Sequence, residues 1–428
     1  MTVFRAEIFQ NEYLSVGSTT VDAIVRVTSS GAGNLPDRNP SSSEIIIVDC
    51  SGSMEHPTKL RKAKDATAAA VDCLRDGVRF AVLAGNTRAT QVYPKKGLAV
   101  ADERTRASAR GAVASLRAGG GTAIGSWLAR AEELFAAEDT SIRHAILLTD
   151  GRNEDETAEA LDAVLALCEG RFQCDCRGVG DDWEVSELRR IASTLLGTVD
   201  IVRRPEELPA EFSALMEAAM GKAVSGLGLQ IWTPRGASVA LLKQTAPDLE
   251  DLTGRRRDVS ELVGEYPTGA WGDESRDYHL RVSVPAKAVG DRMLAGRVSL
   301  ALGGDVVAEG KVLAVWTDDR AMSTRLNDEV AHATGVSELA DAIREGIDAW
   351  EHDDAHAATR HLGLAVQLAD RIGDGDLLGE LERIVDVEDA STGTVRLRAD
   401  ARKIDVMTLD TGSTKTIRRT GEGVGDPP

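Results

Sequence analysis

The sequence is poor in aromatic residues and lacks any long apolar run. Phe, Trp and Tyr make up 4% of its 428 residues. No uninterrupted apolar stretch reaches the roughly 20 residues that a membrane-spanning helix needs, and the first residues lack the apolar segment of a signal peptide. These absences predict a cytoplasmic protein without a membrane partner, and the length predicts about two to four domains.

Cysteine is also scarce, and basic residues are outnumbered. Five cysteines at irregular spacings leave one unpaired, which predicts that no disulfide framework exists. The 69 acidic residues exceed the 50 basic ones and give a net charge of −19. Such a surface repels phosphate backbones, so nucleic acid is excluded as a main partner. An acidic partner residue would need a bound cation to overcome the same repulsion.

One short stretch carries the strongest chemical pattern. The apolar residues 45–48 run without alternation into Asp49, and a Ser-Gly-Ser turn follows. This run predicts a strand buried on both faces of a parallel sheet, with a ligand site at its carboxyl end. Gly52 permits a tight turn that points the Asp49 carboxylate and the Ser51 and Ser53 hydroxyls at one point. Such hard oxygens suit Mg²⁺ or another hard divalent cation better than zinc.

Two later segments are expected at the same edge of the sheet. Thr122 follows the glycines at 119–121 and precedes a helical pattern. The apolar run 144–149 predicts a second buried strand, and it ends at Asp150. Because the carboxyl ends of parallel strands share one edge, we expect Thr122 and Asp150 near the first turn.

Together these segments resemble the metal-ion-dependent adhesion site (MIDAS) of von Willebrand factor type A domains. The resemblance covers roughly residues 43–222 and includes a D-x-S-x-S pattern at 49–53, a threonine after glycines, and T-D-G at 149–151. It implies an intact site of the bacterial cytosolic type that binds Mg²⁺, or Mn²⁺ or Ca²⁺. The implied ligands are Ser51 and Ser53 directly, Asp49 and Asp150 mostly through water, and Thr122 directly or through water. A partner's Asp or Glu would fill the open position.

The surrounding pattern predicts the architecture. Residues 43–222 alternate strands and helices, which indicates an α/β domain with a Rossmann-like, doubly wound, mostly parallel sheet. Short alternating runs in 1–42 and 223–317 predict a β-sandwich into which this domain is inserted. Residues 321–388 have helical periodicity and predict a small hairpin or bundle, and 389–428 predict a polar, largely disordered tail.

The leading functional hypothesis is a metal-dependent adaptor that binds another protein and catalyses no reaction. The resemblance implies AAA+ ATPases, kinases or phosphatases as the partner class. In that family the helix at 206–220 can shift when the metal site changes state, so we expect it to be a candidate coupling element.

A metal-assisted phosphoester hydrolase is the first alternative, because a carboxylate-held Mg²⁺ can activate water. The cluster lacks an evident general base, however, since His56 and His144 are the nearest histidines in sequence. Glu154 and Asp155 follow Asp150 and are expected to begin the next helix, where carboxylates are favoured.

A second alternative places the output in the C-terminal tail. Four threonines lie there among basic residues: Thr411, Thr414, Thr416 and Thr420. Thr414, with Ile417 three residues on, resembles the ligands of forkhead-associated domains, which recognise phosphothreonine. A phosphate on such a residue adds charge that arginines of a partner can bind.

Overall fold

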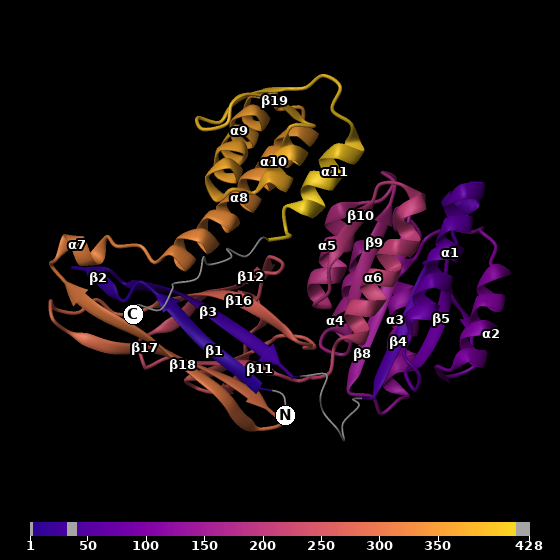
Figure 1. Cartoon of the computed structure of the whole chain (residues 1–428), viewed down its shortest axis with the longest axis horizontal. Helices are drawn as coiled ribbons and strands as arrows, with labels where there is room; N and C mark the ends of the chain where they lie inside the picture. The colour runs from indigo at the N-terminus through magenta and orange to yellow at the C-terminus, as the bar shows by residue number, and fades with distance from the viewer. Residues whose placement is uncertain (1–2, 32–40, 417–428) are drawn as a thin grey trace, which may run out of the picture. The chain divides into compact units, whose positions relative to one another are not determined.

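The computed structural model describes residues 3–31 and 41–416 and forms two compact units (Figure 1). The first unit contains the described residues between 31 and 226, together with 269–273. The second contains 3–30, 227–268 and the described residues from 274 onward. From residue 3 the described chain therefore runs through the second unit, builds the first unit, and then returns to the second, apart from residues 269–273. None of the helices in the described residues has the length and apolar character needed to cross a membrane.

The first unit is built on a seven-stranded sheet with the order β10-β9-β8-β4-β5-β6, in which β7 also pairs with β5. Its strands are β4 (Ser42–Asp49), β5 (Arg79–Gly85), β6 (Ala89–Tyr93), β7 (Ala99–Val100), β8 (Ile142–Thr149), β9 (Gln173–Val179) and β10 (Val199–Val202). All pairs are parallel except those of β6 and β7 with β5. Every residue of β4 is buried, as the unbroken apolar run of that strand requires.

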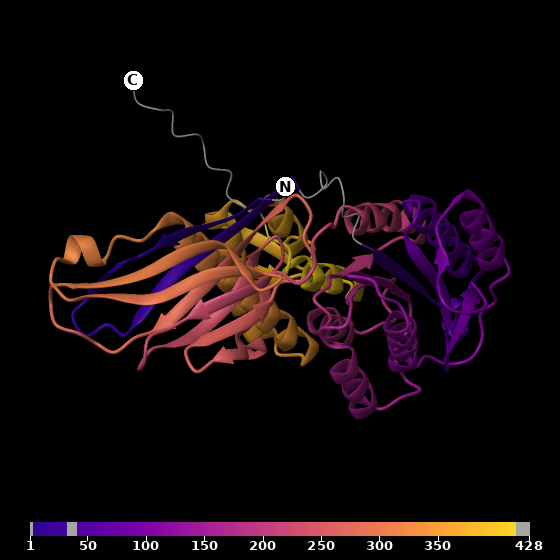
Figure 2. The ribbon, with the colours of Figure 1, turned by 90° about the horizontal axis from the view of Figure 1, so that it is seen from below.

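Helices cover both faces of this sheet (Figure 2). They are α1 (Pro57–Cys73), α2 (Glu103–Ala114), α3 (Ile124–Ala136), α4 (Ala158–Cys168), α5 (Val185–Thr194) and α6 (Leu208–Met220), with 3₁₀ turns η2 (Gly52–Glu55) and η3 (Pro205–Glu207). On one face, α1, α2 and α6 share a core with the sheet through residues such as Ala66, Val113 and Phe212. The predicted α/β fold with a mostly parallel, doubly wound sheet is confirmed.

The strand order reverses between β4 and β8. From β4 the chain adds β5 on one side, and later strands add β8, β9 and β10 on the other. Val48 of β4 lies opposite Leu148 of β8, so Asp49 and Thr149 end their strands side by side. In open α/β sheets, ligands bind at the carboxyl ends of the strands where the order reverses.

The second unit contains a sandwich of two sheets, with the strand orders β1-β3-β16-β12-β13 and β14-β15-β11-β17-β18-β2. The strands are β1 (Val3–Gln10), β2 (Tyr13–Ser15), β3 (Thr20–Ser30), β11 (Gly228–Trp232), β12 (Ser238–Ala246), β13 (Glu250–Asp251), β14 (Arg257–Ser260), β15 (Val263–Pro267), β16 (Glu274–Ser283), β17 (Arg292–Leu302) and β18 (Asp305–Thr317), with the 3₁₀ turn η4 (Thr253–Arg255). Because β3 pairs with β16 from Thr20↔Ser283 to Ser29↔Glu274, the N-terminal strands complete the sandwich, as predicted.

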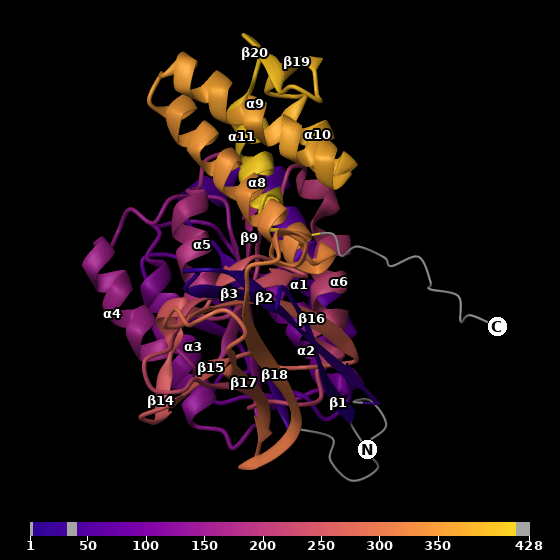
Figure 3. The same cartoon turned by 90° about the vertical axis from the view of Figure 1, so that its left-hand side faces the viewer.

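Helices follow the sandwich in the second unit (Figure 3). They are α7 (Arg320–Ser323), α8 (Asp328–Glu351), α9 (Ala355–Ile372), α10 (Gly375–Leu381) and α11 (Lys403–Gly412), with a hairpin of β19 (Val385–Asp389) and β20 (Thr394–Leu397). One apolar core joins α8 to α11 and the hairpin, and it contains Ile343, Val366, Leu381 and Leu409. Helix α8 begins at Asp328, and the side chain of the preceding Asn327 accepts hydrogen bonds from the first backbone N–H groups.

The prediction of a largely disordered tail from residue 389 is wrong as far as Thr416. Strand β20 and helix α11 are ordered parts of the helical core, and Leu409 is fully buried in it. Thr411 is also fully buried, and its hydroxyl donates a 3.0 Å hydrogen bond to Met407 O. A kinase would therefore reach Thr411 only after α11 unfolds. Thr420 lies outside the described residues.

Candidate metal centre

The turn after β4 gathers three of the predicted side chains. Asp49 is the last residue of β4, and its Oδ1 accepts a 2.7 Å hydrogen bond from Ser51 N. The Ser51 and Ser53 hydroxyls lie 2.9 Å apart. Ser53 Oγ donates a 2.6 Å hydrogen bond to Asp150 Oδ1. The two carboxylates are fully buried, whereas Ser53 is exposed, so the cluster opens to solvent on the Ser53 side.

A buried threonine joins the two strand ends. Thr149, the last residue of β8, donates a 2.6 Å hydrogen bond from Oγ1 to Asp49 Oδ2. Both oxygens of the Asp49 carboxylate are therefore held, one by its own turn and one by the neighbouring strand. Burial raises the pKa of Asp49, and the hydrogen bonds from Ser51 and Thr149 oppose this shift.

The glycine loop brings Thr122 to the same edge. Gly52 N donates to Gly120 O at 2.8 Å, so the loop is fastened to the serine turn by its backbone. A β-carbon added to Gly151 would lie 3.0 Å from Ser53 Oγ and 3.7 Å from Thr122 Oγ1. These two hydroxyls therefore flank Gly151, and a side chain at that position would fill the space between them.

The segment after Asp150 does not begin a helix, which corrects the expectation for Glu154 and Asp155. Helix α4 starts at Ala158 and is capped by Thr157. Asp155 Oδ2 instead accepts a 2.6 Å hydrogen bond from Thr122 N. This carboxylate occupies the space of a β-carbon at Gly121, 1.5 Å from where that atom would lie. Only glycine fits there, and Asp155 positions the threonine loop.

Lys59 is a member of the cluster that was missed in the sequence analysis. It lies in the first turn of α1, and its Nζ is 2.6 Å from Asp150 Oδ2 and 3.5 Å from Asp182 Oδ2. Burial lowers the pKa of Lys59, but the contacts with Asp150 outweigh this effect and raise it, so the ammonium is charged at neutral pH. The available signal was a lysine in the first helical turn after the serines.

The oxygen donors fit a hard divalent cation. Asp150 Oδ2 is buried and already faces one positive charge, the Lys59 ammonium at 2.6 Å, so this oxygen lies where a cation is attracted. Across residues 3–31 and 41–416, no three side chains of His, Cys, Asp or Glu form a metal-binding group. Ser51, Ser53 and Thr122 would therefore have to supply hydroxyl ligands, and a site with two carboxylates suits an ion that keeps several waters, as Mg²⁺ does.

His144 lies too far along β8 to act as a base at this cluster. It is the third residue of the strand and lies five positions before Thr149, or roughly 16 Å at the usual rise per residue. Its Nδ1 lies 2.8 Å from Glu44 Oε2 and its Nε2 3.0 Å from Asp175 Oδ2. Glu44, His144 and Asp175 lie on three neighbouring strands and form an ionic cluster within the sheet, in which Glu44 and His144 are buried and Asp175 is half-buried.

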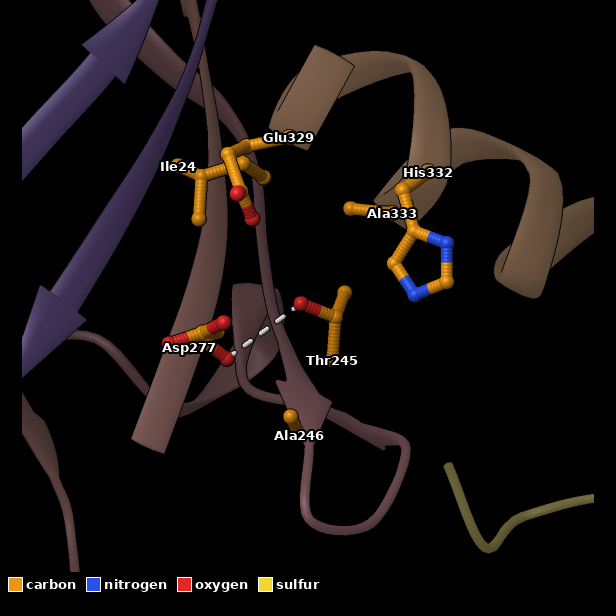
Figure 4. Close-up of a pocket in the computed structure, with 7 residues that line it drawn as sticks. All are labelled: Ile24, Thr245, Ala246, Asp277, Glu329, His332 and Ala333. Atoms are coloured by element: carbon orange, nitrogen blue, oxygen red, sulfur yellow. Dashed lines mark hydrogen bonds between the residues drawn. The ribbon is translucent and has the colours of Figure 1, made fainter. Parts of the chain in front are cut away.

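A pocket in the second unit is another candidate for a ligand site (Figure 4). It is lined by Ile24, Thr245, Ala246, Asp277, Glu329, His332 and Ala333. Its two carboxylates are both held by Arg26, which donates to Asp277 at 2.9 and 3.0 Å and to Glu329 at 2.7 Å. These ion pairs hold the start of α8 on the sandwich. The Asp277 and Glu329 carboxylates therefore have a structural role in joining the helix to the sheet.

Comparisons with known proteins agree with this arrangement. The family model described as von Willebrand factor type A domain matches residues 43–201, and the one described as von Willebrand factor type A C-terminal domain matches 367–413. A solved structure of von Willebrand factor type A from Catenulispora acidiphila is 46% identical, covers 97% of both chains and has a TM-score of 0.92. The ArnB paralog VWA2 from Sulfolobus acidocaldarius is 15% identical over 97% of this chain and 100% of that chain, with a TM-score of 0.58, which shows the shared fold alone. No curated protein matches the chain.

Proposed function

This chain belongs to the von Willebrand factor type A family, and from that premise we propose that it is a divalent-metal-dependent protein-interaction module. The observation that carries the proposal is the cluster at the reversal of strand order. There the Ser51, Ser53 and Asp150 side chains are linked by contacts of 2.9 and 2.6 Å, with Thr122 alongside.

Five residues would hold the metal, which we propose to be Mg²⁺ in the cell. Ser51 and Ser53 would bind it directly, Asp49 and Asp150 mostly through water, and Thr122 directly or through water. When bound, the metal supplies a positive charge and an open coordination position for a partner's Asp or Glu. The protein's own contribution is to fix both carboxylates before binding, which Thr149 and Ser53 do through 2.6 Å hydrogen bonds.

The charge balance supports an acidic partner ligand. The chain carries a net charge of −19, so an acidic partner surface is repelled overall, and a bound cation offsets this repulsion locally. This gives the metal a role in specificity as well as affinity. We propose binding without catalysis, because Asp155, one of the two carboxylates that follow Asp150 in sequence, is occupied with the Thr122 backbone. All five cysteines are free, which favours action in a reducing compartment such as the cytoplasm.

A capture experiment tests the proposal. The wild type and Ser53→Ala would be immobilised and exposed to native lysate, each with Mg²⁺ and with EDTA. We expect a partner that is retained only by the wild type in Mg²⁺. Ser126→Ala is a matched control, because Ser126 lies on α3 and its hydroxyl bonds to Ala123 O. Identical partners in every lane would contradict metal-dependent binding, and turnover of a phosphoester that Ser53→Ala abolishes would favour the hydrolase.

A further inference from the structure

We propose that Lys59 is a tethered cation that shares Asp150 with the divalent metal, and that it thereby lowers the metal affinity of the site. This inference rests on the proposed function, because it requires that the cluster binds a metal. It adds a residue outside the five ligands that sets how tightly the metal is held.

The Lys59 ammonium balances the negative charge of Asp150. This carboxylate is fully buried, and its Oδ1 accepts the Ser53 hydroxyl. Its Oδ2 is held by the Lys59 ammonium, whose Nζ lies 2.6 Å away. A buried carboxylate without a compensating charge is strongly destabilising. Lys59 therefore neutralises Asp150 when no metal is bound.

Lys59 and the metal compete for Asp150. A divalent ion held by Ser51 and Ser53 is attracted by the same carboxylate that Lys59 already neutralises. Two positive charges near one carboxylate repel each other, and burial reduces the screening of that repulsion by water. Metal binding must therefore overcome the repulsion by the Lys59 ammonium. The metal affinity of the site is lower than the oxygen ligands alone would give.

Lys59 has a second carboxylate within reach. Asp182, in the loop between β9 and α5, lies 3.5 Å from the same Nζ, and its side chain is 70% exposed. The ammonium can therefore move toward Asp182 and away from Asp150 without losing an acidic partner. This arrangement lets the site exchange a protein cation for a metal cation.

Metal titration by calorimetry, with Mn²⁺ and with Mg²⁺, tests the proposal. We expect Lys59→Met to bind either ion roughly tenfold more tightly than the wild type, the scale expected from one partly screened charge. Lys59→Arg keeps the charge and should stay close to the wild type. Lys62→Met is the matched control, because Lys62 carries the same charge on the same helix but pairs with Asp65.

The thermal stability of the metal-free proteins is an independent readout. In EDTA, Lys59→Met should melt at a lower temperature than the wild type, and added metal should raise its melting temperature by more. If Lys59→Met does not fold, Lys59→Gln replaces it in both measurements. Wild type that binds metal as tightly as the folded Lys59 variant would overturn this inference alone. If neither protein binds metal, the proposed function fails together with it.

Discussion

The Thr149 hydroxyl donates a 2.6 Å hydrogen bond to Asp49 Oδ2, and so ties the end of β8 to the end of β4. Both residues are fully buried. Because the second Asp49 oxygen is held by Ser51 N, this carboxylate is fixed in orientation before any ligand arrives. The strand-end bond therefore links the stability of the sheet to the geometry of the site.

Thr149→Val should weaken both properties. The substitution keeps the size of the side chain but leaves a buried carboxylate oxygen without its donor, which costs about 1–3 kcal/mol. Calorimetric melting of the metal-free protein would measure the loss, and a Mn²⁺ titration would show weaker binding. Thr149→Ser retains the hydroxyl and should behave as the wild type. Equal behaviour of the valine and serine variants would show that the bond does not matter.

The ionic trio of Glu44, His144 and Asp175 should make the stability of the protein depend on pH. Burial lowers the pKa of His144, but the two carboxylates outweigh it and raise that pKa to about 10. A histidine whose pKa is raised by folding stabilises the protein fully below its unfolded value of about 6.5. That contribution is lost as the pH rises from there to about 10.

Urea titrations of the wild type and His144→Gln between pH 6 and about pH 10 would test this dependence. Near pH 6 the variant should be less stable by about 3–5 kcal/mol, because it leaves the buried Glu44 and the half-buried Asp175 without their cation. The difference in free energy of unfolding should shrink as the pH approaches 10. A difference that stays constant over this range would mean that His144 is not the titrating group.

Helix α11 is part of the folded core of the second unit. Leu409→Ala should destabilise the helical region by about 2–5 kcal/mol, because it creates a cavity among buried side chains. Hydrogen exchange of peptides from α9 and α11 should become faster. Leu364→Ala is the matched control, because it makes the same chemical change at the surface, where Leu364 is 45% exposed. Unchanged exchange in Leu409→Ala would restore the prediction of a disordered tail.

The sequence was most informative where local pattern and topology coincide. Residues 45–48 could be predicted as a buried strand because no polar residue interrupts them, and a parallel sheet places the ends of such strands at one edge. Asp49, Ser51, Ser53, Thr122 and Asp150 could therefore be expected at one place before any coordinates. The structure brings the serines and Asp150 into hydrogen-bonding contact.

The parts that were missed depend on packing between distant segments. Lys59 and Lys62 look alike in sequence, and only the position of α1 over the end of β8 decides which of them meets Asp150. Helix α11 lies within a C-terminal segment that is polar overall, and its order comes from the core of α8 to α10, which receives Val406 and Leu409. Asp155 follows a strand, yet it turns back to the Thr122 backbone.

Anomalous diffraction from crystals of the chain grown with Mn²⁺ tests the central claim most directly. We expect one anomalous peak within bonding distance of Ser51 Oγ and Ser53 Oγ, and none there in crystals of Ser53→Ala. A map of the wild type without a peak at these hydroxyls, or with the ion bound elsewhere, would contradict the claim that this cluster is a metal centre.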